Sequence, residues 1–302
     1  MALAVLLCIA GYAVFEYVTG RFDPPGCTVR AAGKGHGEED YELEPAQAAN
    51  AATITAVASR RGLSERAVTI ALATAMQESG LRNIGHGDRD SVGLFQQRPS
   101  QGWGTAEQIQ DPVYASEEFY SHLAKVPGYS RLPLTVAAQR VQRSGFPQAY
   151  AKHETNAALL TAALTGRRAA SFSCTTGSGG TDSASGDARA GSAAEVRKRL
   201  VREFGRGVLP DDGPAGTAVA SGGSGRRAVA GRDVVVPVEG KQREWELAHW
   251  AVAHADELRI DRVTAGNRAW TAASSDEGWR RTGGENRTGE QGRVTVRTAS
   301  GQ

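Results

Sequence analysis

The sequence predicts an α+β protein, in which a mainly α-helical domain precedes a small C-terminal α/β module. Three observations lead to this prediction. Residues 45–166 carry apolar side chains at helical spacing between Gly and Pro boundaries. Residues 232–300 instead combine short alternating segments with one helical segment. Two stretches rich in Gly and Ser, 175–191 and 211–231, have the composition of disordered linkers.

Five helices are expected in the first domain, which we assign to residues 45–174. Ser64 is a suitable N-cap for the second helix, and Gly80 can adopt the left-handed conformation that ends it. Pro112, Pro133 and Pro147 each open a later helix, because the first helical turn tolerates proline. The five expected ranges are 46–61, 65–79, 112–126, 133–144 and 147–166.

The C-terminal part contains a different pattern of elements. We assign residues 175–231 to a linker that holds one short helix, and residues 232–300 to the α/β module, for which the sequence indicates no function. The expected helices cover 193–203 and 243–258, and the expected strands cover 234–238, 260–264, 269–270 and 293–298.

The N-terminal residues 1–19 are apolar except for Glu16, which is close to the length of about 20 residues that spans a bilayer. We therefore assign residues 1–20 to a membrane anchor or signal segment and residues 21–44 to a linker. A cleaved signal peptide also fits, but we favour the anchor. The expected location is the cell membrane, with a single span and the main domains outside the cytoplasm, or secretion if the segment is removed.

The positions of the cysteines predict a disulfide if the protein is exported. Cys8 lies inside the apolar segment, whereas Cys27 and Cys174 lie on either side of the helical domain. An isolated pair of this kind in an exported protein predicts a disulfide, with two free thiols as the alternative. The net charge is only +2 and no basic run is interleaved with aromatic residues, so we expect no nucleic-acid partner.

Two neighbouring motifs carry the chemistry. Glu78 and Ser79 end the second predicted helix, and the sequence Ser91-Val92-Gly93-Leu94-Phe95-Gln96 follows in a Gly-rich loop. Cleaving a glycosidic bond requires an acid that can donate a proton to the leaving oxygen. The negative end of the helix dipole and the apolar neighbours of Glu78 both favour a protonated carboxyl group. The pattern therefore indicates a sugar-cleaving site.

At this spacing, the two motifs resemble the lysozyme-like lytic transglycosylases, of the soluble lytic transglycosylase type, in an actinobacterial membrane-anchored form. The resemblance covers residues 45–165. It implies that Glu78 alone serves as acid and then base, cutting the MurNAc–GlcNAc β-1,4 bond of peptidoglycan and leaving a 1,6-anhydro product. It further implies no cofactor and glycan strands as the substrate. The N-terminal segment adds the membrane as a partner. Secretion or conjugation machinery is a further candidate partner, and the sequence does not give the physiological role.

The resemblance also suggests substrate-binding positions. Gln139 and Tyr150 stand where the family has an Asn-aromatic-Asn-aromatic-Gly run before a Tyr-Ala pair, and this run is not matched here. Trp103, between two glycines, is the aromatic residue that we expect to stack on a sugar. The expected binding residues are Ser79, Ser91, Gly93, Leu94, Phe95, Gln96, Trp103, Gln139 and Tyr150.

The loop acids leave alternatives open. Asp88 or Asp90 could supply a second carboxylate that guides water, which would make the protein a hydrolytic muramidase. The simpler interpretation is that these acids fix Arg89 or Arg98 within the loop. A calcium loop is not expected, because no Glu follows at the required spacing. Loss of the Asn-aromatic run supports a third alternative, a non-catalytic cell-wall-binding or assembly protein.

Overall fold

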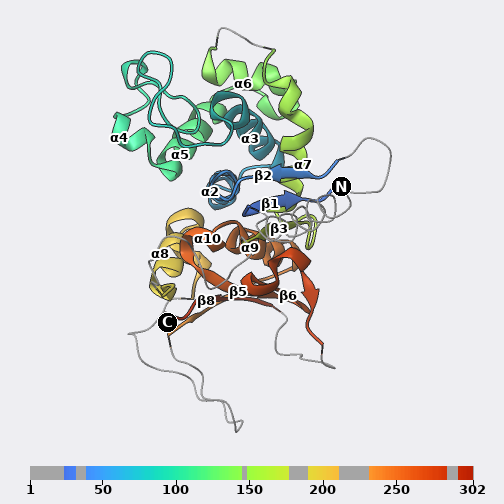
Figure 1. Cartoon of the computed structure of the whole chain (residues 1–302). Coiled ribbons are helices and arrows are strands. Elements are labelled where there is room, and N and C mark those ends of the chain that lie inside the picture. Colours follow the sequence, from blue (N-terminus) through green and yellow to red (C-terminus); the bar gives the residue numbers. More distant parts are fainter. Residues whose placement is uncertain are drawn as a thin grey trace, which may run out of the picture.

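A computed structural model describes residues 24–31, 39–144, 148–176, 190–210, 231–283 and 292–301. It confirms the α+β class: the helices of residues 45–164 lie above the C-terminal sheet, and the C-terminal helices lie between these helices and that sheet (Figure 1). In the described part of the chain, no helix has the length and apolar character needed to cross a membrane. The predicted anchor, and most of the predicted linker residues, lie outside the described ranges.

The helices of the first part follow the boundary signals closely. Gly80, with φ 63°, ends the second helix as predicted, although the Ser64 side chain makes no capping hydrogen bond. Asp111 caps α5 by accepting a hydrogen bond from the Val113 amide at 3.0 Å. The helices are α2 (Pro45–Arg60), α3 (Glu65–Ser79), α4 (Ala106–Ile109), α5 (Pro112–Ala124), α6 (Leu134–Gln142) and α7 (Glu154–Leu164).

Two features of this part differ from the prediction. The short helix α4 was not expected; a capping box formed by Thr105 and Gln108 begins it. The fifth helix begins at Glu154 and not at Pro147, because a turn and the 3₁₀ segment η3 (Ala151–His153) precede it. Pro147 itself lies outside the described residues. The remaining 3₁₀ segments are η1 (Pro99–Gln101), η2 (Tyr129–Arg131), η4 (Arg206–Val208) and η5 (Ala272–Glu277).

A three-stranded antiparallel sheet lies beside these helices. Its order is β2 (Tyr41–Leu43), β1 (Gly26–Val29), β3 (Phe172–Thr175). Two of the strands lie inside the segment that composition assigns to a linker. Each has only three or four residues, so the alternation is too short to read, and pairing across about 150 positions of sequence forms the sheet. Cys27 pairs with Cys174 in this register, and the predicted disulfide between them is confirmed.

Removing this disulfide should lower stability strongly. The bond closes a loop with a sequence separation of 147, for which the chain-entropy relation gives about 5 kcal/mol. We expect the double variant Cys27→Ser, Cys174→Ser to unfold at markedly lower urea concentration than the oxidised protein. The matched comparison is Cys8→Ser, which leaves the disulfide intact. Equal unfolding midpoints for the double variant and the oxidised protein would contradict the prediction.

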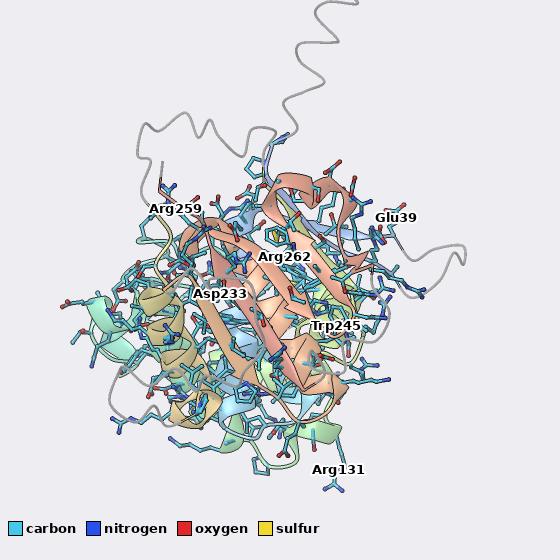
Figure 2. The ribbon with its side chains drawn as sticks, turned by 90° about the horizontal axis from the view of Figure 1, so that it is seen from below. Glu39, Arg131, Asp233, Trp245, Arg259 and Arg262 are labelled. Atoms are coloured by element: carbon cyan, nitrogen blue, oxygen red, sulfur yellow. A yellow bond between two sulfur atoms is a disulfide. The ribbon has the colours of Figure 1, made fainter. Side chains whose placement is uncertain are left out.

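The C-terminal sheet has five antiparallel strands in the order β4-β8-β5-β6-β7. Helices α9 and α10, separated at His254 where one helix was predicted, cover one of its faces (Figure 1). The opposite face carries Asp233 and Arg262 (Figure 2) and the 46% exposed Val235. The elements are α8 (Ala193–Phe204), α9 (Lys241–Ala253), α10 (Ala255–Leu258), β4 (Asp233–Pro237), β5 (Ile260–Ala265), β6 (Arg268–Thr271), β7 (Arg280–Arg281) and β8 (Arg293–Thr298).

The helical part and the C-terminal module share one hydrophobic core. Helix α9 packs against α2, α7 and β3, and helix α8 packs against α2. The approach is close at Gly166, where a Cβ atom would lie 1.9 Å from the Gln242 carbonyl oxygen. Trp270 and Trp279 of the module donate hydrogen bonds to the β3 carbonyls of Cys174 and Phe172, at 3.0 and 2.7 Å. The module therefore contributes directly to the packing around the disulfide.

A buried ionic network lies between α2, α8 and α9. Glu203 is fully buried and accepts hydrogen bonds from Trp250 Nε1 at 2.7 Å and Thr53 Oγ1 at 3.0 Å. His254 Nε2 lies 3.6 Å and Arg199 Nη1 3.4 Å from its carboxylate. Burial alone would raise the pKa of Glu203, but these partners together hold it below its usual value. The network therefore favours the ionised form of Glu203.

His249 should make this packing sensitive to acid. It is buried, with Nδ1 2.7 Å from the Ala163 carbonyl oxygen and the rings of Phe172, Trp245 and Trp279 around it. Burial lowers the pKa of His249 from 6.5 to about 4. A depressed pKa means that its stabilising effect is complete above pH 6.5 and is lost as the pH falls toward 4, by about 3 kcal/mol.

The measurement is urea unfolding of wild type and His249→Asn between pH 7 and 4.5. Asn can keep the donor to Ala163 but does not titrate, so the variant should lose less stability on acidification. The difference between the two curves removes the contribution of the other acids. Parallel curves would show that His249 does not cause the acid sensitivity.

Candidate functional site

Glu78 lies in the last turn of α3, and its side chain is partly exposed. The helix ends sharply after it: the Gly80 amide bonds to the Met76 carbonyl and the Leu81 amide to the Ala75 carbonyl. Two side chains of α2 hold this end of α3 in place. Gln47 donates to the Gly80 carbonyl at 2.7 Å and Asn50 to the Leu81 carbonyl at 2.8 Å. The backbone that carries Glu78 is thus held on both sides.

Tyr150 is the direct partner of Glu78. Its hydroxyl lies 2.6 Å from Glu78 Oε1, although 72 residues separate the two positions. Tyr150 is fully buried. Burial and the hydrogen bond to Glu78 both raise the pKa of Tyr150, outweighing the opposite effect of Ser144. The phenol therefore stays protonated and donates to the carboxyl oxygen, which fixes one oxygen of Glu78.

Two side chains from different helices hold the loop that follows Glu78. The Ser79 hydroxyl donates to the Leu94 carbonyl at 2.8 Å, and Gln142 Nε2 donates to the next carbonyl, that of Phe95, at 2.7 Å. Phe95 is buried and stacks on Phe119 with a centroid separation of 4.6 Å. Ser79, Leu94 and Phe95 thus help to set the position of the loop backbone. Their own side chains make contacts within the protein.

Gly93 and Gln96 also serve the loop itself. Gly93 has φ 78°, and a Cβ atom there would lie 2.7 Å from the Ile109 carbonyl oxygen, so the close approach that requires glycine is to α4. Gln96 Nε2 donates to the Gly93 carbonyl at 3.2 Å. The expected binding residue Ser91 is buried, and its amide bonds to the Asp88 carbonyl at 3.1 Å. These residues therefore maintain the conformation of the loop.

Trp103 does not lie open to solvent as a sugar platform would. It is only 8% exposed, and its ring lies 4.0 Å from the His122 ring. The flanking glycines allow the chain to turn the indole inward: Gly104 has φ 115° and lies against Tyr114. The packing of Trp103 on α5 is the outcome expected of a large apolar side chain in a short loop.

The two loop acids differ in what they contact. Asp90 accepts hydrogen bonds from Arg98 Nε at 2.9 Å and from the Ser100 amide at 2.8 Å. The Ser100 amide and Arg98 hold the pKa of Asp90 well below its usual value. Asp90 therefore fixes Arg98 within the loop. Asp88 is exposed, and its carbonyl closes the turn at Ser91.

The run that departs from the family motif has a structural use. Gln139, on α6, donates from Nε2 to the Ser144 carbonyl at 2.6 Å, which secures the end of its own helix. Gln142, one turn later, holds the Phe95 carbonyl. From the sequence, Gln142 is only a substitute within the unmatched run, and no pattern points to Gln47 or Asn50. Their role depends on which backbone carbonyl lies opposite, and no local pattern gives this information.

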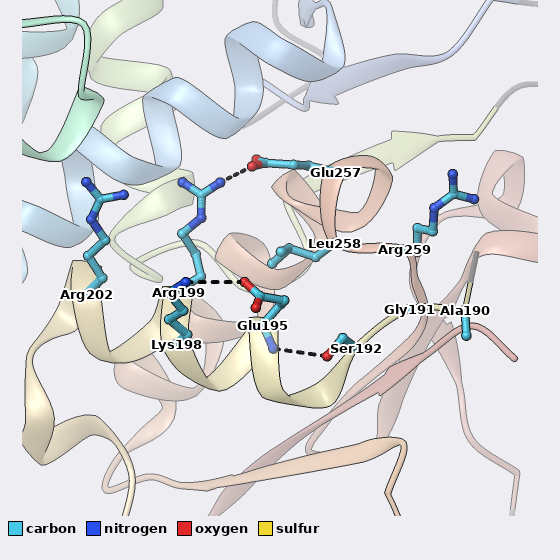
Figure 3. Close-up of a pocket in the computed structure, with 10 residues that line it drawn as sticks. All are labelled: Ala190, Gly191, Ser192, Glu195, Lys198, Arg199, Arg202, Glu257, Leu258 and Arg259. Carbon is cyan, nitrogen blue, oxygen red and sulfur yellow. Dashed lines mark hydrogen bonds and ion pairs between the residues drawn. The ribbon is translucent and has the colours of Figure 1, made fainter. Parts of the chain in front are cut away.

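Among the described residues, no group of three or more His, Cys, Asp or Glu side chains could hold a metal ion. A pocket of about 430 Å³ lies elsewhere, between α8 and α10 (Figure 3). Comparison with protein-family models gives no match to this chain, and no curated protein matches it significantly. The geometry around Glu78 and Tyr150 is therefore the basis for a functional assignment.

Proposed function

We propose that this protein cleaves the glycan strands of peptidoglycan as a lytic transglycosylase, with Glu78 as the single acid and base. The observation that carries the proposal is the contact between the Tyr150 hydroxyl and Glu78 Oε1 at 2.6 Å. It joins a partly exposed carboxyl group to a buried donor that fixes its orientation. General acid–base catalysis requires such a fixed group, and typically contributes about 10²–10⁴-fold to a rate.

In this mechanism Glu78 donates its proton to the oxygen of the glycosidic bond as that bond breaks. The resulting carboxylate then takes the proton of the C6 hydroxyl of the same sugar, which attacks C1 and closes the anhydro ring. Proton and charge balance, and no water enters. Tyr150 stabilises the carboxylate between the two steps by a charge-assisted hydrogen bond. Ser79 and Gln142 keep the adjoining loop in place through its Leu94 and Phe95 carbonyls.

The bonding of Asp90 favours this mechanism over the muramidase alternative. A hydrolytic enzyme with two acids needs a second carboxylate that can guide water. Asp90 is occupied by Arg98 and the Ser100 amide. Only Asp88, which is exposed, would then be available from the loop. We therefore expect Asp88→Asn to leave turnover unchanged.

One observation favours a second candidate, a cell-wall-binding protein without turnover. Gln139 and Gln142 replace the Asn-aromatic run, and both amide groups are used on backbone carbonyls. Their remaining oxygen atoms are buried, so neither is presented to a substrate. A protein that kept Glu78 but binds glycans weakly at this position would bind the wall without cutting it. In either case we propose an extracytoplasmic location, with the N-terminal segment as the membrane attachment.

Digestion of purified peptidoglycan followed by mass spectrometry separates the candidates. The transglycosylase releases muropeptides with a 1,6-anhydro ring, lighter by one water than the hydrolytic product. Products with reducing ends would show the muramidase reaction, and Asp88 would then be the candidate for the second carboxylate. Pelleting of the protein with insoluble peptidoglycan, without any released product, would assign the wall-binding function.

Tyr150→Phe tests the role of the phenol directly. The variant keeps the buried ring and removes only the donor to Glu78, a hydrogen bond to a charged group that is worth about 1.5–3 kcal/mol. We expect muropeptide release to fall by about ten- to a hundredfold, with a lower thermal midpoint but a folded protein, because the same hydrogen bond also stabilises the fold. Tyr129→Phe, at a half-buried tyrosine of η2, is the control. Full activity of Tyr150→Phe would remove Tyr150 from the mechanism.

A further inference from the structure

The 3₁₀ turn η3 directly follows Tyr150 and makes a second contact with the last turn of α3. His153 Nε2 lies 3.2 Å from Gln77 Oε1, and Gln77 is the residue before Glu78. Tyr150 thus bonds to Glu78, and His153, three positions later, bonds to the neighbour of Glu78. Two consecutive side chains of α3 are therefore held by two side chains from one short segment.

These contacts form a closed ring. The His153 amide donates to the Tyr150 carbonyl at 3.1 Å, which ties the two residues together within the turn. Gln77 and Glu78 are neighbours in α3, so their separation is also fixed. Because the Tyr150 ring is fully buried in close-packed surroundings, its hydroxyl moves mainly with the backbone of the turn. The hydrogen bond between His153 and Gln77 opposes any movement of that backbone away from α3.

The turn η3 contributes little packing of its own. None of its residues is fully buried, and Ala151 and Lys152 are exposed. A 3₁₀ turn has poorer hydrogen-bond geometry than an α-helix, and segments with few buried contacts open at a low cost in free energy. Among the described residues, the half-buried His153 is the only member of the turn whose side chain forms a hydrogen bond with α3. This bond is therefore the specific attachment of the turn to the helix that carries Glu78.

The neutral form of His153 suits this contact. Burial, and less strongly the charge of Lys152, lowers the pKa of His153 below its usual value of 6.5. The ring is therefore neutral at pH 7.5 and carries one N–H, which Nε2 must hold in order to donate to the Gln77 side-chain oxygen. Measurements at pH 7.5 involve a single protonation state of this ring.

We propose that His153 is a positioning residue for glycan cleavage, because its hydrogen bond to Gln77 keeps the Tyr150 hydroxyl in contact with Glu78. The proposal rests on the proposed function and adds to it a residue that acts through Tyr150. A displacement of about 1 Å at a catalytic site can cost about a hundredfold in rate, so a small shift of the turn matters. The loss is limited here by the net contribution of one neutral hydrogen bond, which corresponds to about three- to tenfold.

Two substitutions of similar size test the donor, with the full chain and purified peptidoglycan at pH 7.5. His153→Met removes the N–H, and we expect kcat for muropeptide release to fall about three- to tenfold with KM unchanged. His153→Gln supplies an amide N–H at a similar reach, so its kcat should return to the wild-type value. Lys152→Gln, at the exposed neighbouring position, is the control and should leave both constants unchanged. Equal losses in His153→Met and His153→Gln would overturn the proposal.

A second background separates positioning from a general effect on packing. In Tyr150→Phe, the phenol through which His153 acts is absent, so adding His153→Met should cause no further loss of activity. If His153→Met lowers kcat by the same factor in both backgrounds, its effect does not pass through Tyr150, and the proposal is wrong.

A spectroscopic measurement tests the contact without any turnover. With carbon-13 at Cζ of the seven tyrosines, the Tyr150 signal is identified by its absence from the spectrum of Tyr150→Phe. Glu78→Gln, which replaces the charged acceptor by a neutral one, shows the direction in which a weaker hydrogen bond moves this signal. His153→Met should move it in the same direction, and His153→Gln should not.

The two kinds of failure can be distinguished. An unchanged Tyr150 signal in His153→Met would overturn the positioning role, even if the wild type cleaves peptidoglycan. A wild type that releases no product, together with the expected shift of the signal, would instead reject the proposed function while supporting the contact that His153 maintains.

Discussion

Glu78→Gln should reduce muropeptide release by at least about a hundredfold and leave the fold unchanged. Glutamine has nearly the same size as glutamate and can still accept the hydrogen bond from Tyr150, but it cannot donate the proton that the leaving oxygen requires. The measurement is the rate of product release from purified peptidoglycan, with the thermal unfolding midpoint recorded alongside. Binding to insoluble peptidoglycan should persist, because the glycan contacts are retained.

The matched control is Glu65→Gln, at the opposite end of the same helix. It alters the same type of side chain in α3 without touching Tyr150, so its activity should equal that of wild type. Should Glu78→Gln retain more than about one-tenth of the activity, catalysis by general acid at this position would be excluded. A wild type without turnover, together with unchanged binding in Glu78→Gln, would instead favour the wall-binding candidate.

Glu203→Ala should destabilise the protein by about 3–5 kcal/mol, the usual result of removing one member of a buried ionic network. The substitution leaves the Trp250 indole N–H and the Thr53 hydroxyl without their acceptor, and it leaves His254 and Arg199 without their carboxylate. Because the network joins α2 of the helical part to α8 and α9, we expect both parts to unfold in one transition at lower urea concentration.

Glu195→Ala is the control for this experiment. Glu195 lies on the same helix, but its side chain is mostly exposed and only loosely paired with Lys198. Its replacement should change the free energy of unfolding by less than about 0.5 kcal/mol. A similar small change for Glu203→Ala, or two separate unfolding transitions in wild type, would show that the network does not couple the two parts.

The sequence by itself determined the elements whose signals are local. Apolar spacing with Ser64 and Gly80 at the boundaries predicted α3 to the residue, and thereby put Glu78 in its last turn. Alternation predicted β4, β5 and β8 within one residue at each end. The cysteine count and context predicted the Cys27–Cys174 bond. In each case the determining interaction lies within a few residues, or depends on residue type alone.

Tertiary structure decided where those elements meet. Tyr150 reaches Glu78 only because α7 packs on α3, and Gln142 reaches the Phe95 carbonyl only because α6 lies beside the loop. The sequence pattern suggested that Trp103 stacks on a sugar, yet packing against α5 leaves it only 8% exposed. Strands β1 and β3 are too short to show alternation and form because each supplies hydrogen bonds to the other across the chain.

The same distinction applies to the C-terminal module. Local patterns gave its helix and most of its strands, but nothing in them indicates that α9 packs against α2, α7 and β3. A buried carboxylate such as Glu203 looks in the sequence like any other charged residue on an amphipathic helix. Its environment is built from Thr53, Trp250 and His254, which come from two other helices. Burial and partnership are properties of the folded chain, because they depend on contacts between residues far apart in sequence.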